Sequence, residues 1–172
     1  MLEKDTQGHN IEILFSPEDR IVDYAMRQCL SARKTVDIAV YLIGSKRAAN
    51  ALVKAHKKGI AIRIVIDKKV ARSRYSKHKF LLRHGISVKT VRVRAGSMHI
   101  KFILVDKEKV IAGSANLTND ANRRNHEFFF ISSDQEIIKI FSTKFEELWA
   151  IGKKQTSRSK KRKTQGERGV GG

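Results

Sequence analysis

The chain has 172 residues, enough to bury the core of one domain, and its 41% apolar and 31% charged residues are typical of a globular protein in water. Its net charge of +19 is exceptional and predicts a polyanionic partner, either nucleic acid or an anionic membrane surface. A single cysteine excludes an intramolecular disulfide, and the lack of an apolar signal segment or bilayer-spanning run favours a cytoplasmic protein.

Strands and helices alternate through the first half of the chain. The predicted strands cover residues 11–15, 35–42 and 61–67. The first predicted helix begins at the sequence SPED, with Ser16 as N-cap and Pro17 at the first helical position, and runs to Arg33. A second helix is predicted for residues 46–58, where a glycine follows it.

The second half of the chain contains a predicted hairpin. A basic segment comes first, with a predicted helix over residues 76–84. The predicted strands cover residues 88–93, 99–105, 110–114 and 127–132. A short Asp-Lys-Glu-Lys turn joins the second and third of these, and an amphipathic helix is predicted for residues 134–150. Together the elements predict an α/β fold with a mixed β-sheet flanked by helices.

The composition changes at Lys153. Residues 153–172 carry eight Lys or Arg and one Glu, a net charge of +7, and too few apolar residues to bury a core. We therefore predict one folded domain over residues 1–152, which keeps a charge of +12, and a basic tail without a fold of its own. The tail's KKRK cluster is interpreted as a nucleic-acid arm, a localisation signal or a solubilising segment. Its residues are Lys160, Lys161, Arg162 and Lys163.

The stretch MHIKFILVD combines a core strand with reactive side chains. Alternate residues of a strand point to the same face, so His99 and Lys101 are predicted to lie side by side. An imidazole can attack or donate a proton while an ammonium holds an anionic oxygen, which suits phosphate chemistry. Ser114 and Asn116 can hydrogen-bond phosphate oxygens, and the carboxylate of Glu127 is suited to orient the far imidazole nitrogen.

The segment HIKFILVDKEKVIAGSAN resembles the H-x-K-x4-D-x6-G-S-x-N signature of the phospholipase D superfamily. Every fixed position of the signature matches, at His99, Lys101, Asp106, Gly113, Ser114 and Asn116. Residues 11–150 are similar to the small single-motif members, which are bacterial nucleases and the related mitochondrial cardiolipin hydrolase and piRNA-pathway nuclease. Glu127 resembles the acidic residue that follows the signature in these members, and the resemblance implies a phospholipase D-like fold.

The resemblance also implies a homodimer. Family members use two such motifs related by a twofold axis, and this chain has one, so two chains would share a site. One His99 would attack phosphorus and the partner's His99 would protonate the leaving oxygen, while Lys101 and Asn116 hold the other oxygens. Ser114 is expected to orient rather than attack, and Asp106 to have a structural part within the signature.

Two alternatives concern the histidines. A second H-x-K sequence, at His56, has no following Gly-Ser-x-Asn, and we interpret it as part of a solvated helix end. A metal site could recruit His99 and His126 with Asp106 or Glu127, but none of these has a spacing typical of metal ligands. We therefore expect neither a metal nor another cofactor.

The signature does not name the substrate. Basic residues near the catalytic strand and in the loop before Glu127 are predicted to bind nucleic acid together with the KKRK cluster. These residues are Lys68, Lys69, Arg72, Arg74, Arg123 and Arg124. A lipase is expected to expose an apolar surface or a membrane helix beside the site, and neither is evident in the sequence. We predict a metal-independent endonuclease of low sequence specificity on DNA or RNA. The alternatives are a hydrolase of anionic phospholipid such as cardiolipin, and a nucleic-acid-binding protein with a vestigial site.

Overall fold

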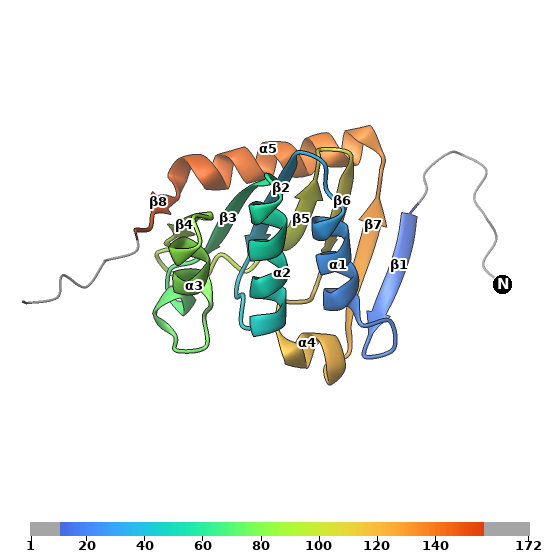
Figure 1. The fold of residues 1–172 in the computed structure, drawn as a ribbon, viewed down its shortest axis with the longest axis horizontal. Helices are drawn as coiled ribbons and strands as arrows, with labels where there is room; N and C mark the ends of the chain where they lie inside the picture. Colours follow the sequence, from blue (N-terminus) through green and yellow to red (C-terminus); the bar gives the residue numbers. More distant parts are fainter. Residues whose placement is uncertain (1–10, 157–172) are drawn as a thin grey trace, which may run out of the picture.

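The computed structural model describes residues 11–156, whose strands form one eight-stranded sheet in the order β1-β7-β6-β5-β2-β3-β4-β8 (Figure 1). The strands are β1 (Ile11–Ser16), β2 (Thr35–Val40), β3 (Ala61–Asp67), β4 (Ser87–Val91), β5 (Lys101–Val105), β6 (Lys109–Gly113), β7 (Glu127–Ser132) and β8 (Lys153–Lys154). The helices are α1 (Ile21–Leu30), α2 (Lys46–Lys57), the 3-10 turn η1 (Val70–Arg72), α3 (His78–Arg83), α4 (Asn119–Arg123) and α5 (Gln135–Ile151). The predicted mixed sheet flanked by helices is confirmed.

Strand directions bring several chain segments to one edge of the sheet. β2, β3 and β4 are parallel, whereas β5, β6, β7 and β1 follow one another in antiparallel pairs. The carboxyl ends of β1, β2, β3 and β4 therefore meet the amino ends of β5 and β7. We call this the His99 edge, because the chain enters β5 there. Ligands of open α/β sheets bind at the carboxyl ends of parallel strands, so a ligand-binding site is expected at this edge.

Two apolar layers hold the helices to the sheet. The larger layer joins α1, α2 and α3 to one face, and the smaller layer joins α5 to the other face. Arg63 of β3 strengthens the α5 side, since it donates two 2.7 Å hydrogen bonds to buried Asp37 and also binds Glu146 of α5. Its guanidinium lies 4.8 Å from the ring centroid of Phe145. The buried carboxylate is thus fully paired, as a buried charge has to be.

The prediction that Ser16 caps the first helix is wrong. Ser16 ends β1, its peptide bond to Pro17 is cis, and α1 begins only at Ile21. The hydroxyl of Ser16 is used elsewhere, since it donates to the carbonyl of Asn125 at 2.9 Å. The first turn of α1 is capped from a distant part of the chain: Oδ1 of buried Asn122 accepts from the amides of Val22 and Asp23. A cap 100 residues away in sequence has no local signal.

Other predicted boundaries move by a few residues. The helix predicted to reach Arg33 ends at Leu30, and β5 begins at Lys101 rather than at His99. α4 and β8 were not predicted; β8 pairs with β4, so the first residues assigned to the basic tail belong to the sheet. In the part of the chain that the structure describes, no helix combines the length and apolar character needed to cross a bilayer.

Replacing Asn122 with alanine is expected to destabilise the fold by about 1–2 kcal/mol, because one buried and one partly buried amide donor of α1 lose their acceptor. Urea unfolding measures the change. Asn50→Ala is the matched control, since Asn50 is exposed within α2 and alanine suits a helix interior. Equal stability of the two variants would mean that the long-range cap is unimportant.

Candidate active site

His99 and Lys101 are in direct contact at the His99 edge. The Nζ atom of Lys101 lies 2.7 Å from Nδ1 of the imidazole and 2.6 Å from the carbonyl oxygen of His99. The ring of Tyr41, which follows β2, lies 4.8 Å from the imidazole ring, centroid to centroid. The pair predicted to lie side by side therefore does so, and an aromatic ring that the sequence did not indicate supports it.

The two members of the pair differ in exposure. His99 is open to solvent, whereas Lys101 is only 8% exposed. Burial lowers the pKa of the Lys101 ammonium, and the negative charge of Glu127 opposes that shift. A poorly solvated ammonium beside an accessible imidazole can hold a phosphate oxygen while the imidazole reacts.

Ser114 and Glu127 form a second hydrogen-bonded pair, at the end of β6 and the start of β7. The hydroxyl of Ser114 donates to Glu127, and its amide donates to the carbonyl of Phe128 at 3.1 Å. Gly113 makes this close approach possible, since a Cβ atom there would lie 2.2 Å from the carbonyl oxygen of Phe128. The prediction that Glu127 contacts the far nitrogen of His99 is wrong for this conformation, because its carboxylate binds Ser114 and Asn125.

Asn116 lies on the segment that leaves β6 toward α4. Its side-chain oxygen accepts from the amide of Leu42 at 3.2 Å, which ties this segment to the end of β2. The amide nitrogen of Asn116 keeps its donors for a ligand, since no described residue accepts from it. Asn116 can therefore still supply the predicted contact to a phosphate oxygen.

Asp106 lies at the opposite end of β5, away from His99, so the structure does not bring it into the site. Its carboxylate accepts from the backbone amides of Arg33, Lys34 and Thr35 at 2.7–2.9 Å. Burial alone would raise the pKa of Asp106, but these hydrogen bonds and the charge of Arg33 lower it. Asp106 thus joins the β5–β6 hairpin to the start of β2, a structural part.

Asp67 is a residue of the site region that the sequence analysis missed. It ends β3 and is 1% exposed. One carboxylate oxygen accepts from the amide of Lys69 at 2.7 Å, and the other accepts from the amide of Met98 at 2.8 Å. Met98 precedes His99, so this carboxylate fixes the backbone that carries the imidazole. An acid directly after the apolar run Ile64–Ile66 of a central strand was the available signal.

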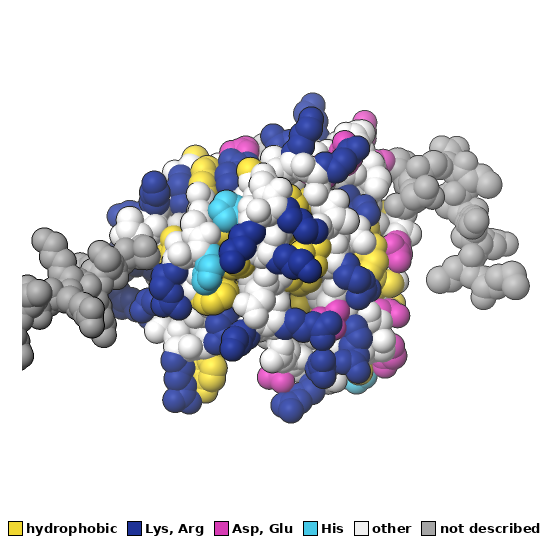
Figure 2. Space-filling view, viewed as in Figure 1, with side chains coloured by type: hydrophobic (Ala, Val, Ile, Leu, Met, Phe, Trp, Pro, Cys, Tyr) yellow, Lys and Arg dark blue, Asp and Glu magenta, His cyan; other side chains and the backbone are white. Residues whose placement is uncertain are grey.

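Five of the predicted nucleic-acid-binding residues line two hollows at the His99 edge, whereas Arg74 lines neither of them. Lys68, Lys69 and Arg72 line a hollow of about 450 Å³ that we call the basic pocket. Its other lining residues are Arg92, Val93 and Arg94. Figure 2 shows Lys and Arg side chains along the lower border of the molecule, where Figure 1 shows the loops of this edge. The KKRK residues Lys160, Lys161, Arg162 and Lys163 lie outside the described residues.

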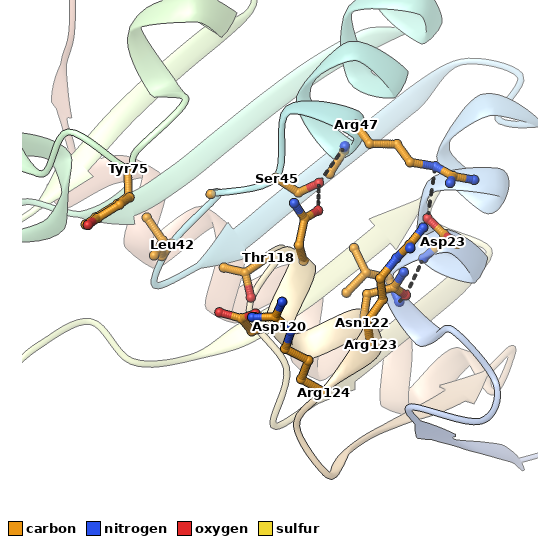
Figure 3. Close-up of a pocket in the computed structure, with 14 residues that line it drawn as sticks. Asp23, Leu42, Ser45, Arg47, Tyr75, Thr118, Asp120, Asn122, Arg123 and Arg124 are labelled. Atoms are coloured by element: carbon orange, nitrogen blue, oxygen red, sulfur yellow. Dashed lines mark hydrogen bonds and ion pairs between the residues drawn. The ribbon is translucent and has the colours of Figure 1, made fainter.

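The second hollow, the α4 cleft, has a volume of about 850 Å³ and lies between α1, α2 and α4 (Figure 3). Arg123 and Arg124 line it, and Arg124 pairs with Asp120 at 3.2 Å. Tyr75 closes one end, with the guanidinium of Arg74 at 4.9 Å from its ring centroid. The cleft mixes acidic, amide and basic groups, whereas the basic pocket has no acidic lining.

The histidines and carboxylates of the site are possible metal ligands. Within residues 11–156, no three His, Cys, Asp or Glu side chains are grouped so that they could hold one metal ion. The expectation of a metal-independent site therefore stays a prediction about the reaction itself.

Comparison with known families agrees with this geometry. Residues 25–149 match the sequence model of the family described as "Cardiolipin synthase, PLD-like domain". The chain belongs to this phospholipase D-like family. A mitochondrial cardiolipin hydrolase from Danio rerio is 32% identical over 141 residues, covering 82% of this chain and 59% of the relative. A phospholipase D from Rickettsia conorii is 30% identical, covering 76% and 65%. The chain spans about half to three-fifths of the length of the cardiolipin hydrolases it first matches.

Solved structures confirm the phospholipase D-like fold. The phospholipase D family member Nuc from Salmonella typhimurium superposes with a TM-score of 0.79 at 25% identity, covering 87% of this chain and 99% of that one. NucT from Helicobacter pylori superposes with a TM-score of 0.81 at 21% identity, covering 86% and 99%. Because the sequence identity to NucT is lower, that comparison supports similarity of fold alone.

We predict that Glu127→Gln lowers the pKa of Lys101 further, because the variant removes the carboxylate whose charge raises it. NMR titration of the Lys101 side-chain resonances measures the shift. Ser114→Ala is the control, since it removes the hydroxyl but keeps the carboxylate. A pKa that stays unchanged or rises in Glu127→Gln would contradict the assigned interaction.

Asp67→Asn is expected to speed hydrogen exchange at the amide of Met98, because asparagine has one acceptor oxygen where the carboxylate uses two. Asp106→Asn is the matched variant at the other end of the sheet and should speed exchange at Lys34 and Thr35 instead. Both variants are expected to lose about 1–3 kcal/mol of stability. Unchanged protection of Met98 in Asp67→Asn would show that Asp67 does not hold this backbone.

Proposed function

We propose that the protein is a metal-independent endonuclease of low sequence specificity. The observation that carries this proposal is the contact between exposed His99 and buried Lys101 at a sheet edge flanked by two hollows that contain basic residues. The intact signature argues against a vestigial site, because the residues that such chemistry requires are all present.

The reaction proceeds in two displacements at phosphorus. The imidazole of His99 attacks, the bond to the leaving oxygen breaks, and a phosphohistidine forms while that oxygen takes a proton. Water then attacks the phosphohistidine, gives up a proton to a base, and releases the phosphate end and the free imidazole. Lys101 and the amide nitrogen of Asn116 stabilise the charge on the non-bridging oxygens.

A second imidazole serves as acid in the first displacement and as base in the second. In one chain, His99 is the only signature histidine, so we assign this part to the partner's His99 in a homodimer. The exposure of His99 supports the assignment, since the imidazole is accessible to a second copy of the chain. Ser114 orients Glu127, whose negative charge opposes the lowering of the Lys101 pKa by burial.

Nucleic acid is the favoured substrate because of the charge distribution. The net charge of +19 suits a polyanion, and the basic pocket presents five cations without an acidic neighbour in its lining. Binding that depends on the phosphate backbone is sequence-independent, which accounts for the low specificity that we assign.

A phospholipid hydrolase is the second candidate, and one observation favours it. Phe15 and Phe128 are neighbours on β1 and β7 and are 56% and 41% exposed, beside the strand position of Glu127. An exposed apolar pair thus lies beside Glu127, although no such surface was evident in the sequence. Relatives named cardiolipin hydrolase also agree with this candidate. This candidate would be established if the protein hydrolysed cardiolipin vesicles but not oligonucleotides. The rate of vesicle hydrolysis should then fall in Phe15→Ser.

His99→Ala is expected to reduce cleavage of labelled DNA or RNA by at least about 1,000-fold in the presence of EDTA, because the nucleophile is lost. His56→Ala is the control, since His56 begins the other H-x-K sequence and its side chain hydrogen-bonds only to the local carbonyl of Ile60 among the described residues. Single-stranded DNA, duplex DNA, RNA and cardiolipin vesicles are assayed in parallel.

Cleavage that survives in His99→Ala would contradict the mechanism, and cleavage abolished by EDTA in the wild type would contradict metal independence. Release of phosphatidic acid from vesicles with no cut nucleic acid would replace the nuclease by the phospholipid hydrolase.

A further inference from the structure

The basic pocket gathers cations from two separate chain segments. Lys68, Lys69 and Arg72 come from the turn after β3, and Arg92 and Arg94 follow β4. Within residues 11–156, none of these five side chains forms an ion pair, although other cations of the same chain pair with carboxylates. Like charges gathered in a hollow raise one another's energy, and a bound anion relieves that repulsion.

The pocket and the reactive imidazole belong to one supported unit. The carboxylate of Asp67 binds the amides of Lys69 and Met98, and the ammonium of Lys69 donates to the carbonyl of Gly96 at 2.7 Å. The amide of Lys68 also donates to the carbonyl of Val91, the last residue of β4. Hydrogen bonds at Val91, Gly96 and Met98 therefore fix the backbone between the arginines of the pocket and His99.

The basic pocket and His99 are too far apart to bind the same phosphate group. The pocket lies at the ends of β3 and β4, which are two and three strand positions from β5 in the sheet. With neighbouring strands ~4.8 Å apart, the pocket is ~10–14 Å from the start of β5. One phosphate cannot reach both places, whereas a strand of a few nucleotides can span them.

We propose that the basic pocket binds a backbone phosphate of the substrate strand that is separate from the phosphodiester at His99, so that the enzyme favours strands long enough to reach both. This inference rests on the proposed nuclease function and adds a second phosphate site to it. The lining supplies charge and one apolar residue, Val93, but no aromatic ring, so it reads the backbone and not the bases.

The test compares two double variants that remove the same charge. Arg92→Gln with Arg94→Gln alters the pocket; Arg27→Gln with Arg83→Gln removes two exposed arginines from the last turns of α1 and α3, at the opposite edge of the sheet. Each is assayed on a 12-nucleotide single strand, on a dinucleotide and on bis(4-nitrophenyl) phosphate, a small diester with one phosphate. Thermal melting confirms that both variants are folded.

The pocket variant should raise KM for the 12-mer about ten-fold and reduce the salt dependence of its binding, while turnover of bis(4-nitrophenyl) phosphate stays within about two-fold of wild type. The preference of the wild type for the 12-mer over the dinucleotide should shrink in the pocket variant alone. The opposite-edge variant should behave like wild type on all three substrates.

Three results would overturn the inference. Equal loss in both double variants would indicate a general charge effect. A parallel loss on bis(4-nitrophenyl) phosphate would mean that the loop disturbs His99 and is not a separate phosphate site. A wild type that hydrolyses the small diester but no oligonucleotide would instead refute the proposed nuclease function, and the pocket site with it.

Discussion

A single buried carboxylate holds the His99 edge together. Asp67 ends the central strand β3, and its two oxygens bind backbone amides on either side, one in the turn after β3 and one at Met98. Backbone donors satisfy the buried charge without neutralising it through a side-chain cation. The cations of the basic pocket do not pair with this carboxylate, and the residue before the imidazole is fixed in space. The positions of His99, the loop before it and the basic pocket all depend on this arrangement.

The two edges of the sheet have different parts in the molecule. At the edge away from His99, Asp106 binds three backbone amides and closes the hairpin against β2, and its depressed pKa records that stabilisation. At the His99 edge, by contrast, the amide nitrogen of Asn116 has no acceptor among the described residues, and the imidazole of His99 is exposed to solvent. The phospholipase D-like signature therefore spans both ends of the same strand pair, with Asp106 at one end and His99 at the other, which is why its fixed positions do not all face one site.

Periodicity in the sequence was enough to predict the sheet and most of its helices, because the central strands β2 and β3 are mostly apolar and alternate with amphipathic helices. Local signals failed where distant residues supply the partner. Ser16 looked like a helix cap, but the chain near Asn125 takes its hydroxyl, and Asn122 caps α1 in its place. The short helix α4 carries no apolar period of its own and was missed for that reason.

The candidate site was predictable where spacing alone determines contact. His99 and Lys101 are two residues apart on an extended segment, so their contact followed from strand geometry. Long-range contacts could not be predicted in this way. Tyr41 contacts the imidazole and Asp67 binds the amide of Met98, but both residues are far from His99 in sequence, so residue spacing does not indicate either contact. The convergence of two basic segments on one pocket likewise depends on β3 and β4 being neighbours.

Trapping the covalent intermediate tests the proposed role of His99 as nucleophile. The protein would be mixed with an oligonucleotide labelled at its internal phosphates, denatured in alkali, where phosphohistidine persists, and digested for mass spectrometry. We predict a nucleotidyl or phosphoryl group on the peptide that contains His99, and none in His99→Ala. A label on Ser114 or any other side chain, or turnover without a covalent label in rapid-quench samples, would contradict it.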